Sequence, residues 1–126
     1  MSTAVVLAPS ILVVDARAVS RTHAGCLIRN RWPDARVNEA NDADSALAEL
    51  ADGETDLVIV DLPGETGLAF AQRLRDKQPN CQVALLAEAP TAAQRSRADK
   101  AGIRLFRTPV TGDVIEQVLA LVGYDD

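Results

Sequence analysis

The chain has 126 residues, of which 48% are hydrophobic and 25% are charged, a balance typical of one globular domain with a single core. The formal net charge of −5 argues against general nucleic-acid binding, which favours basic surfaces. The longest apolar runs have the length of strands, and the N-terminus lacks the pattern of a signal peptide, so the sequence predicts a cytoplasmic chain without membrane spans. Cys26 and Cys81 lack the spacing of a zinc or redox site, and we expect two buried thiols.

Apolar runs alternate with helical patterns from the start of the chain, after a loose lead-in expected over residues 1–9. The first strand covers residues 11–15 and has the continuous apolar character of a strand buried on both faces of a parallel sheet. The first helix follows over about residues 17–31, and Pro33 ends it. Its inward-facing side chains are expected to be Val19, Cys26, Leu27 and Trp32. The second strand is short, residues 35–40.

The middle of the chain repeats this alternation. Asn41 or Asp42 caps the second helix, and Gly53 ends it. The apolar residues of this helix, at helical spacing, are Ala43, Ala46, Leu47 and Leu50. The third strand covers residues 56–61, and proline and glycine predict a loop over residues 63–67 before the third helix begins.

The remaining elements follow in the same order. Leu68, Ala71 and Leu74 form the inner stripe of the third helix, which ends before Pro79. The fourth strand covers residues 82–87. The fourth helix begins at Thr91, which forms a capping box with Gln94, and stops near Gly102. The fifth strand is residues 103–106, and Thr111 or Asp113 caps a fifth helix with a strong apolar stripe.

Five strands that alternate with five helices, at lengths that suit right-handed crossovers, predict an α/β fold. We expect a single (βα)5 doubly wound domain over residues 1–126, with its core at about 10–122. The natural arrangement at this size is a flavodoxin-like, five-stranded parallel sheet in the order 2-1-3-4-5.

The fourth helix differs from the others because its apolar residues are all alanines, Ala92, Ala93, Ala98 and Ala101. Burying alanine gains far less free energy than burying a larger aliphatic side chain, so this helix should be the most weakly docked. Five basic side chains lie on this helix and the strand after it: Arg95, Arg97, Lys100, Arg104 and Arg107. They indicate either a solvated basic face or a docking surface for an acidic partner or ligand.

Two predicted strands each end in a carboxylate, Asp15 after the first strand and Asp61 after the third. In an open α/β sheet, ligands bind outside the carboxyl ends of the strands, so the two acids predict an acidic pocket. Mg²⁺ binds through one or two carboxylates and keeps several waters, and a carboxylate beside it can attack a phosphoryl group. Asp residues at strand ends also cap the loops that follow, and this reading stays open.

The strand that ends at Asp15, the strand that ends at Asp61 before a Pro/Gly loop, and Thr108-Pro109 after the fifth strand resemble the receiver domain of response regulators. The resemblance covers about residues 10–122. It implies that a histidine kinase or phosphotransfer protein passes a phosphoryl group to Asp61. It also implies weak Mg²⁺ binding by Asp15, Asp61 and the backbone carbonyl of Pro63, and that the Thr108–Pro109 bond is cis.

The sequence departs from the receiver pattern at several positions. Ala16 replaces the second acid, and Leu86 or Ala87 stands where a Ser or Thr is expected. Thr108 replaces the lysine, and Leu105 stands at the switch aromatic, with Phe106 pointing to the opposite face. The loop after Asp61 is also about two residues short.

These departures predict an atypical receiver, a pseudo-receiver, that acts largely as a protein-interaction module for another signalling protein. A phosphorylation-dependent single-domain regulator is the first alternative. Clustered arginines, including Arg17 and Arg21, leave cyclic-dinucleotide binding as a further alternative. An enzyme is not expected, because a hydrolase needs a placed acid or base and the only histidine, His23, lies on the first helix.

Overall fold

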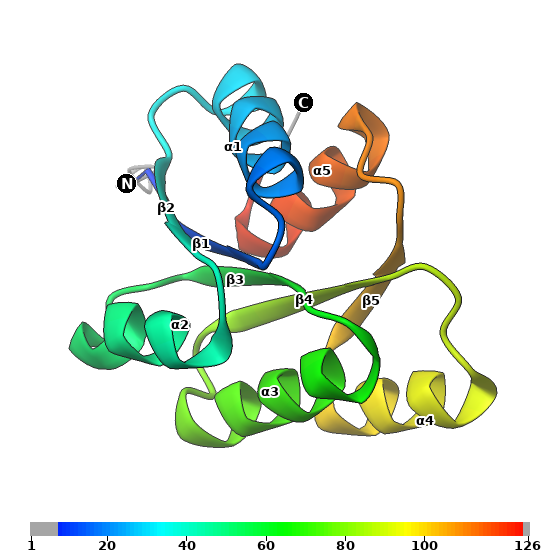
Figure 1. Cartoon of the computed structure of the whole chain (residues 1–126). Coiled ribbons are helices and arrows are strands. Elements are labelled where there is room, and N and C mark those ends of the chain that lie inside the picture. Colours follow the sequence, from blue (N-terminus) through cyan, green and yellow to red (C-terminus); the bar gives the residue numbers. More distant parts are fainter. Residues whose placement is uncertain (1–7, 125–126) are drawn as a thin grey trace, which may run out of the picture.

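Five parallel strands form one sheet in the order β2-β1-β3-β4-β5 (Figure 1). The computed structural model describes residues 8–124, so most of the lead-in expected over 1–9 lies outside the described residues. The strands are β1 Ser10–Asp15, β2 Arg36–Ala40, β3 Leu57–Asp61, β4 Gln82–Ala87 and β5 Arg104–Arg107. The fold class, strand order and parallel sheet predicted from the sequence are confirmed.

Five helices cover the two faces of the sheet. They are α1 Ala18–Arg31, α2 Ala43–Glu49, α3 Gly64–Lys77, α4 Ala92–Ala101 and α5 Gly112–Leu119, with short 3-10 turns at Leu50–Asp52 and Ala120–Val122. Helices α1 and α5 lie on one face and α2, α3 and α4 on the other (Figure 1). The three central strands are therefore buried on both sides, which explains why they are apolar without alternation. No helix within residues 8–124 is long and apolar enough to cross a membrane.

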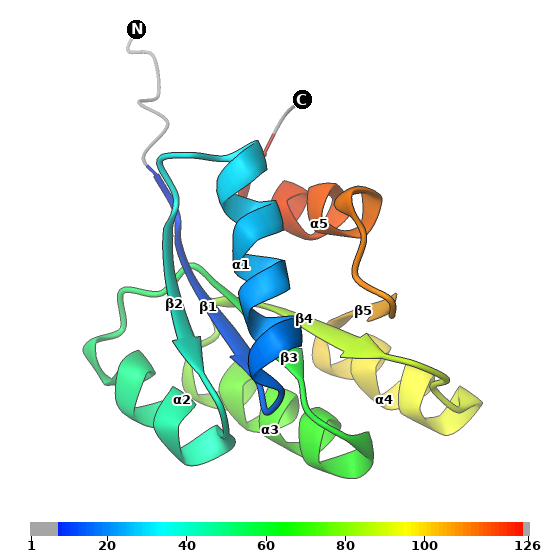
Figure 2. The same cartoon turned by 45° about the horizontal axis from the view of Figure 1, so that its top comes forward.

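Side chains of successive strand residues enter two separate cores. Leu12, Val58 and Leu85 pack under α2, α3 and α4, whereas Val13, Ile59 and Leu86 pack under α1 and α5. This alternation is the period of two that a strand imposes. All strands run in the same direction, so their carboxyl ends lie along one edge of the sheet (Figure 2).

Three predicted helix caps are confirmed. The Asp42 side chain accepts a hydrogen bond from the backbone of Ser45, and Thr111 caps α5 in the same way. Thr91 and Gln94 form the expected capping box, each satisfying a backbone N–H of the other. These caps fix where α2, α4 and α5 begin, and therefore where their connecting loops meet the edge of the sheet.

The inward face of α1 differs from the prediction. Val19 is 84% exposed, and Cys26 is also exposed, whereas Ala24 and Ile28 are buried against the sheet. At about 100° per residue, Val19 and Cys26 lie roughly half a turn away from Ile28. The expectation of two buried thiols is therefore wrong for Cys26 and holds for Cys81.

Helix α3 begins earlier in the chain than the sequence predicts from Pro63 and the glycines that follow it. It starts at Gly64 with Pro63 as the N-cap residue, so the loop expected over 63–67 is mostly helix. The early start requires a close approach of Gly67 to the Leu62 carbonyl oxygen, since a Cβ added at Gly67 would lie 2.5 Å from that atom. Glycine at this position therefore lets the helix begin at Gly64, three residues after Asp61.

Arg75 joins the C-terminal ends of α3 and α4 to the start of β4. Its guanidinium donates to the backbone carbonyls of Cys81 at 2.9 Å, Pro79 at 3.2 Å and Ala101 at 3.4 Å. Helix α4 buries only Ala98. Polar contacts therefore contribute much of its docking: the one from Arg75 at its C-terminal end and the one between Gln94 and Glu65 near its N-terminal end. The expectation of a weakly packed α4 fits this burial pattern.

Candidate functional site

Asp15 and Asp61 stand side by side at the carboxyl edge of the sheet. They end the adjacent parallel strands β1 and β3, and the pairing register places them directly opposite each other. Neighbouring strands are about 4.8 Å apart, so the two carboxylates are close. The side chain of Asp15 is 4% exposed and that of Asp61 is 16% exposed. The acidic pocket expected from the strand ends is thus assembled in the structure.

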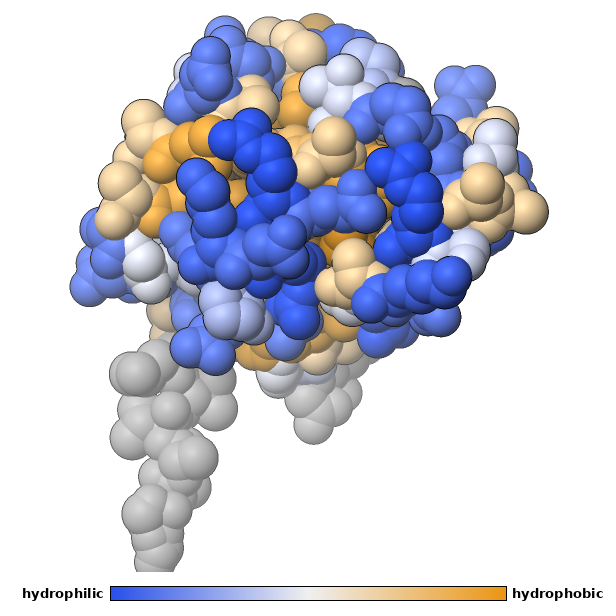
Figure 3. Space-filling model, turned by 90° about the horizontal axis from the view of Figure 1, so that it is seen from below, coloured by the Kyte–Doolittle hydropathy of each residue, from blue (hydrophilic) through white to orange (hydrophobic). Residues whose placement is uncertain are grey.

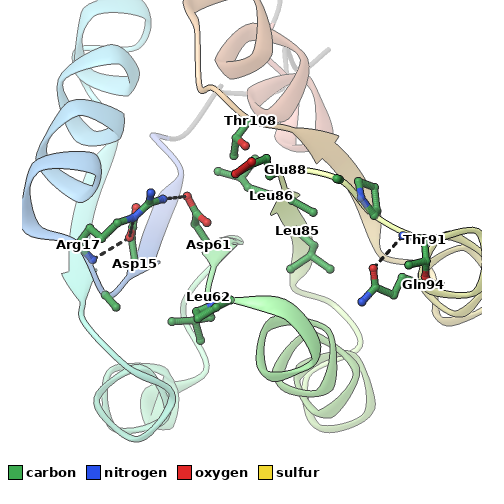
Figure 4. Close-up of a pocket in the computed structure, with 15 residues that line it drawn as sticks. Asp15, Arg17, Asp61, Leu62, Leu85, Leu86, Glu88, Thr91, Gln94 and Thr108 are labelled. Atoms are coloured by element: carbon green, nitrogen blue, oxygen red, sulfur yellow. Dashed lines mark hydrogen bonds and ion pairs between the residues drawn. The ribbon is translucent and has the colours of Figure 1, made fainter.

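A basic side chain occupies this acidic pocket. The Nη2 atom of Arg17 lies 2.9 Å from Oδ2 of Asp61, and its Nε lies 3.5 Å from Oδ1 of Asp15 (Figure 4). The backbone N–H of Arg17 also donates to Oδ1 of Asp15 at 2.9 Å. One residue therefore bonds to both carboxylates, using its main chain and its side chain.

The two acids and the arginine affect one another's protonation. Burial, and then the neighbouring Asp15 charge, raise the pKa of Asp61 above its ordinary value, and the attraction of Arg17 offsets this only in part. The charges of Asp61 and then Asp15 raise the pKa of Arg17, which therefore remains protonated. Both shifts include the same attraction between Arg17 and Asp61. This attraction raises the pKa of Arg17 and lowers that of Asp61, but for Asp61 burial and the Asp15 charge outweigh it.

A cavity of about 580 Å³ opens beside Asp61, between β1, β3, β4 and the N-terminal end of α4. Its wall across from Asp61 includes Leu85 and Leu86, with Glu88 and Thr108 near one end (Figure 4). Ala87 also lines the cavity. Leu86 follows the β4 partner of Val60 and so stands at the level of Asp61. On the β4 and β5 side of the cavity, Thr108 offers a bound anion a neutral hydroxyl, Glu88 adds a carboxylate, and none of the described lining residues is a cation.

A divalent cation does not fit the site in this arrangement. Two carboxylates face each other, but the guanidinium of Arg17 already bonds to both, and Ala16 supplies no further oxygen ligand from its side chain. Within residues 8–124, no three His, Cys, Asp or Glu side chains are grouped so that they could hold a metal ion. The donor set suits a guanidinium better than a hydrated ion such as Mg²⁺, which prefers an octahedron of oxygens.

The sequence model of the response regulator receiver domain matches residues 11–108, most of the chain. The chain belongs to this family. It is thus a receiver domain of two-component signal transduction, a class of module that interacts with histidine kinases and other signalling proteins. The resemblance drawn from the strand-end acids and Thr108-Pro109 is confirmed, and the Thr108–Pro109 bond is cis as expected.

Solved structures share the fold of this receiver domain. A CheY-like response regulator receiver domain protein from Methanospirillum hungatei JF-1 has a TM-score of 0.80 at 17% identity, over 91% of this chain and 94% of that one. A response regulator from Thermotoga maritima has a TM-score of 0.77 at 26% identity, over 92% and 98%. The Vibrio cholerae chemotaxis protein CheY4 has a TM-score of 0.77 at 19% identity, over 91% and 98%.

One curated relative matches in sequence. The sensory transduction protein LytT of Bacillus subtilis (strain 168) is 33% identical over 67 residues, which are 52% of this chain. The matched region spans 28% of the length of LytT. The likeness therefore concerns one part of a longer protein.

The positions at which the sequence departs from the receiver pattern gather around this cavity, with one exception. The cavity is lined by the departing positions Ala16, Leu86, Ala87 and Thr108, together with Pro63 and the two acids. The exception is Leu105, which packs under α3 and α4 and is not among the lining residues. Phe106 packs in the opposite core, so the prediction that these two neighbours face opposite sides is confirmed.

The basic residues of α4 and β5 do not form one continuous face. Arg97 is already paired, because its guanidinium contacts the carboxylate of Glu65 at 2.6 Å and the amide oxygen of Gln72 at 3.0 Å, both on α3. Arg104 and Arg107 lie three residues apart on a strand, so their side chains leave opposite faces of β5. Four of the five basic residues on α4 and β5 are exposed to solvent: Arg95, Lys100, Arg104 and Arg107.

Polar residues cover most of the face formed by α2, α3 and α4, with apolar surface showing between them (Figure 3). Glu65 is central to the contact between α3 and α4, since it also accepts a hydrogen bond from Gln94 at 3.0 Å. These contacts lower the pKa of Glu65, the bond from Gln94 contributing most. Glu65 follows Asp61 by four residues, so it connects the end of β3 to α4.

Sequence reasoning did not identify the role of Arg17. The spacing of Arg17 and Arg21 indicates a potential ligand-binding pair, but both guanidinium groups are engaged within the chain. Arg21 donates to the backbone carbonyl of Asp15 at 2.8 Å and pairs with Glu39 at 3.0 Å. The available signal was an arginine two residues after a strand-terminal Asp, close enough to fold back over it.

Proposed function

We propose that this receiver domain acts mainly as a protein-interaction module in two-component signalling, and that its binding surface does not depend on phosphorylation of Asp61. The observation that supports this most strongly is the wall across from Asp61. Leu85, Leu86 and Ala87 offer no polar side-chain atom there, and Thr108 offers one neutral hydroxyl. A phosphoryl group adds about two negative charges and several strong acceptor oxygens, which this wall would leave without cationic donors.

A phosphorylation-driven switch needs a contact that forms only when the phosphoryl group is present. Charge-assisted hydrogen bonds of the kind a lysine would make contribute about 1.5–3 kcal/mol each. On the β4 and β5 side of this cavity, none of the described lining residues is a cation. Phosphorylated and unphosphorylated forms would therefore differ little in the energy of the loop after β4, and phosphorylation would leave the output surface unchanged.

The surface offered to a partner includes the exposed basic residues beside α4. Arg95 and Lys100 on α4 and Arg107 at the end of β5 are exposed, and no ion pair engages them in the part of the chain that the structure describes. We infer that the partner is an acidic surface of a signalling protein, such as a histidine kinase or a phosphotransfer protein. Helix α4 buries little of its own surface, which leaves it available for contact.

Titration with Mg²⁺ and beryllofluoride, a mimic of the phosphoryl group, tests this function. Backbone amide shifts of Asp61, Leu62 and Thr108 report binding directly. We expect no saturable shift at millimolar Mg²⁺. The double variant Ala16→Asp/Thr108→Lys is the matched control, since it restores an acid and a cation at the cavity without changing buried side chains.

The double variant should bind beryllofluoride roughly ten- to a hundred-fold more tightly than the natural chain, the factor that about 1.5–3 kcal/mol corresponds to. A saturable shift of comparable affinity in the natural chain would instead establish the phosphorylation-dependent regulator, with Asp61 as its phosphoacceptor. Repeating the measurement on Asp61→Asn shows whether any shift arises at that carboxylate.

A further inference from the structure

We propose that Arg17 is a resident cation, tethered to the chain, that holds Asp15 and Asp61 together and keeps divalent cations out of the site. This inference rests on the proposed function, in which the carboxylates serve the structure of a module and not a phosphoryl transfer. It adds a specific prediction, namely that a hidden Mg²⁺ site lies beneath Arg17 and is uncovered when its guanidinium is removed.

The geometry supports this because all the contacts converge. Adjacent strands bring the two carboxylates together in register, and Arg17 contacts Asp61 through Nη2 at 2.9 Å and Asp15 through its backbone N–H at 2.9 Å. The guanidinium reaches across both acids (Figure 4). A bound Mg²⁺ beside a guanidinium that stayed in place would leave more positive than negative charge on these four groups. The ion and the arginine therefore compete for the same two carboxylates.

The local structure of α1 gives a second, independent reason. Arg17 is the N-cap residue of α1, makes no side-chain cap, and is followed by a first turn without any acidic residue. A positive charge is unfavourable at a helix N-terminus, where the macrodipole favours anions, and arginine is not among the preferred N-cap residues. The position is explained if the two carboxylates compensate for this cost.

Burial distinguishes this contact from an ordinary surface ion pair. The Arg17 side chain is 65% exposed, and an exposed pair usually contributes little to stability. Its partners are different, because Asp15 and Asp61 are largely removed from water and carry like charges side by side. Without the guanidinium these carboxylates would have no cation, and a divalent ion from solution would fill that role.

Thermal unfolding in MgCl₂ tests the proposal with the metal alone. In the natural chain, millimolar MgCl₂ should raise the melting temperature no more than NaCl of matched ionic strength. In Arg17→Ala, Mg²⁺ should stabilise the folded state, changing the folded-to-unfolded ratio roughly ten-fold at ten times its dissociation constant. Mn²⁺ should broaden the amide signals of Asp15 and Asp61 in Arg17→Ala and leave them sharp in the natural chain.

Three variants control this experiment. Arg21→Ala removes an arginine one helical turn away that bonds to the Asp15 carbonyl and not to its carboxylate, so it should show no Mg²⁺ response. Adding Asp15→Asn to Arg17→Ala should abolish the response. Arg17→Gln keeps a long polar side chain without charge and should also gain Mg²⁺ binding, which provides a reading if Arg17→Ala folds poorly.

Two results would overturn the proposal: equal Mg²⁺ responses in the natural chain and in Arg17→Ala, or no Mg²⁺ response in either Arg17 variant. These outcomes are separate from failure of the proposed function. That function fails if the natural chain binds beryllofluoride, whereas this inference concerns the metal in the absence of any phosphoryl mimic.

Discussion

Replacing Gly67 with alanine should destabilise the fold and displace the segment that follows Asp61. Gly67 lies in the first turns of α3, where its Cα approaches the end of β3. A Cβ at this position would lie 2.5 Å from the Leu62 carbonyl oxygen and 3.3 Å from Cδ1 of Leu85. The nearer atom belongs to the backbone and cannot move aside by a change of rotamer, so the start of α3 must shift.

Two opposing effects set the size of the change. Overpacking a well-filled site costs about 1–3 kcal/mol, whereas replacing glycine by alanine within a helix gains about 0.5–1 kcal/mol. The net loss in the free energy of unfolding should be about 1–2 kcal/mol. For a domain of this size, that loss lowers the melting temperature by about 3–8 °C.

Urea unfolding followed by circular dichroism measures this loss, and amide spectra of Asp61 and Leu62 report the local displacement. Thr66→Ala is the matched control, because Thr66 is exposed on the same turn, and its free energy of unfolding should change by less than about 0.5 kcal/mol. A Gly67→Ala variant as stable as the natural chain, with unshifted Asp61 and Leu62 signals, would refute the close approach that lets α3 begin at Gly64.

Three further predictions concern stability, thiol reactivity and pH. Arg75→Ala should lower the free energy of unfolding by about 1–3 kcal/mol in urea, since three backbone carbonyls lose their donor. Arg73→Ala, an exposed position on the same helix, should change it little; equal losses would contradict this role. A thiol reagent at neutral pH should label Cys26 alone in the folded chain, because burial raises the pKa of the Cys81 thiol to about 11; rapid labelling of both would show that Cys81 is accessible. The raised pKa of Asp61 means that the folded state holds this proton more tightly than the unfolded chain. Stability in EDTA should therefore fall as pH rises from the unfolded value of about 3.9 towards the folded pKa, and Asp61→Asn should flatten this fall; identical urea profiles of the two proteins would count against it.

The sequence predicted the fold because its central strands are apolar without alternation and each ends at a polar residue. Residues 11–15 and 56–61 could be placed in a parallel sheet, and Asp15 and Asp61 at its edge, since parallel strands end on the same side. The start of α3 was misplaced because Pro63 and Gly64 are common in loops. Proline also suits the beginning of a helix, where its missing N–H leaves no hydrogen bond unmade.

Contacts made by long side chains were the part that the sequence did not predict. Position along the chain fixes where the Cα of Arg17 lies, but its guanidinium can reach several neighbours, and the choice depends on the charges that the sheet gathers around it. The exposure of Val19 was misassigned for a different reason. The apolar character of Val19 predicts an inward-facing side chain, although its angle from Ile28 around the helix places it in solvent.

The way α4 is attached has a consequence for its motion. Among its side chains only Ala98 is buried, and the contacts of Glu65 with Gln94 and Arg97 are exposed to solvent and weakened by salt. Segments with few buried apolar contacts open at a small fraction of the global unfolding free energy. Helix α4 should therefore detach from the sheet as a unit while the remaining strands stay paired. A partner that binds α4 would then select among attached and detached forms that the free protein already populates. Its apparent affinity would therefore depend on the ionic strength of the cell.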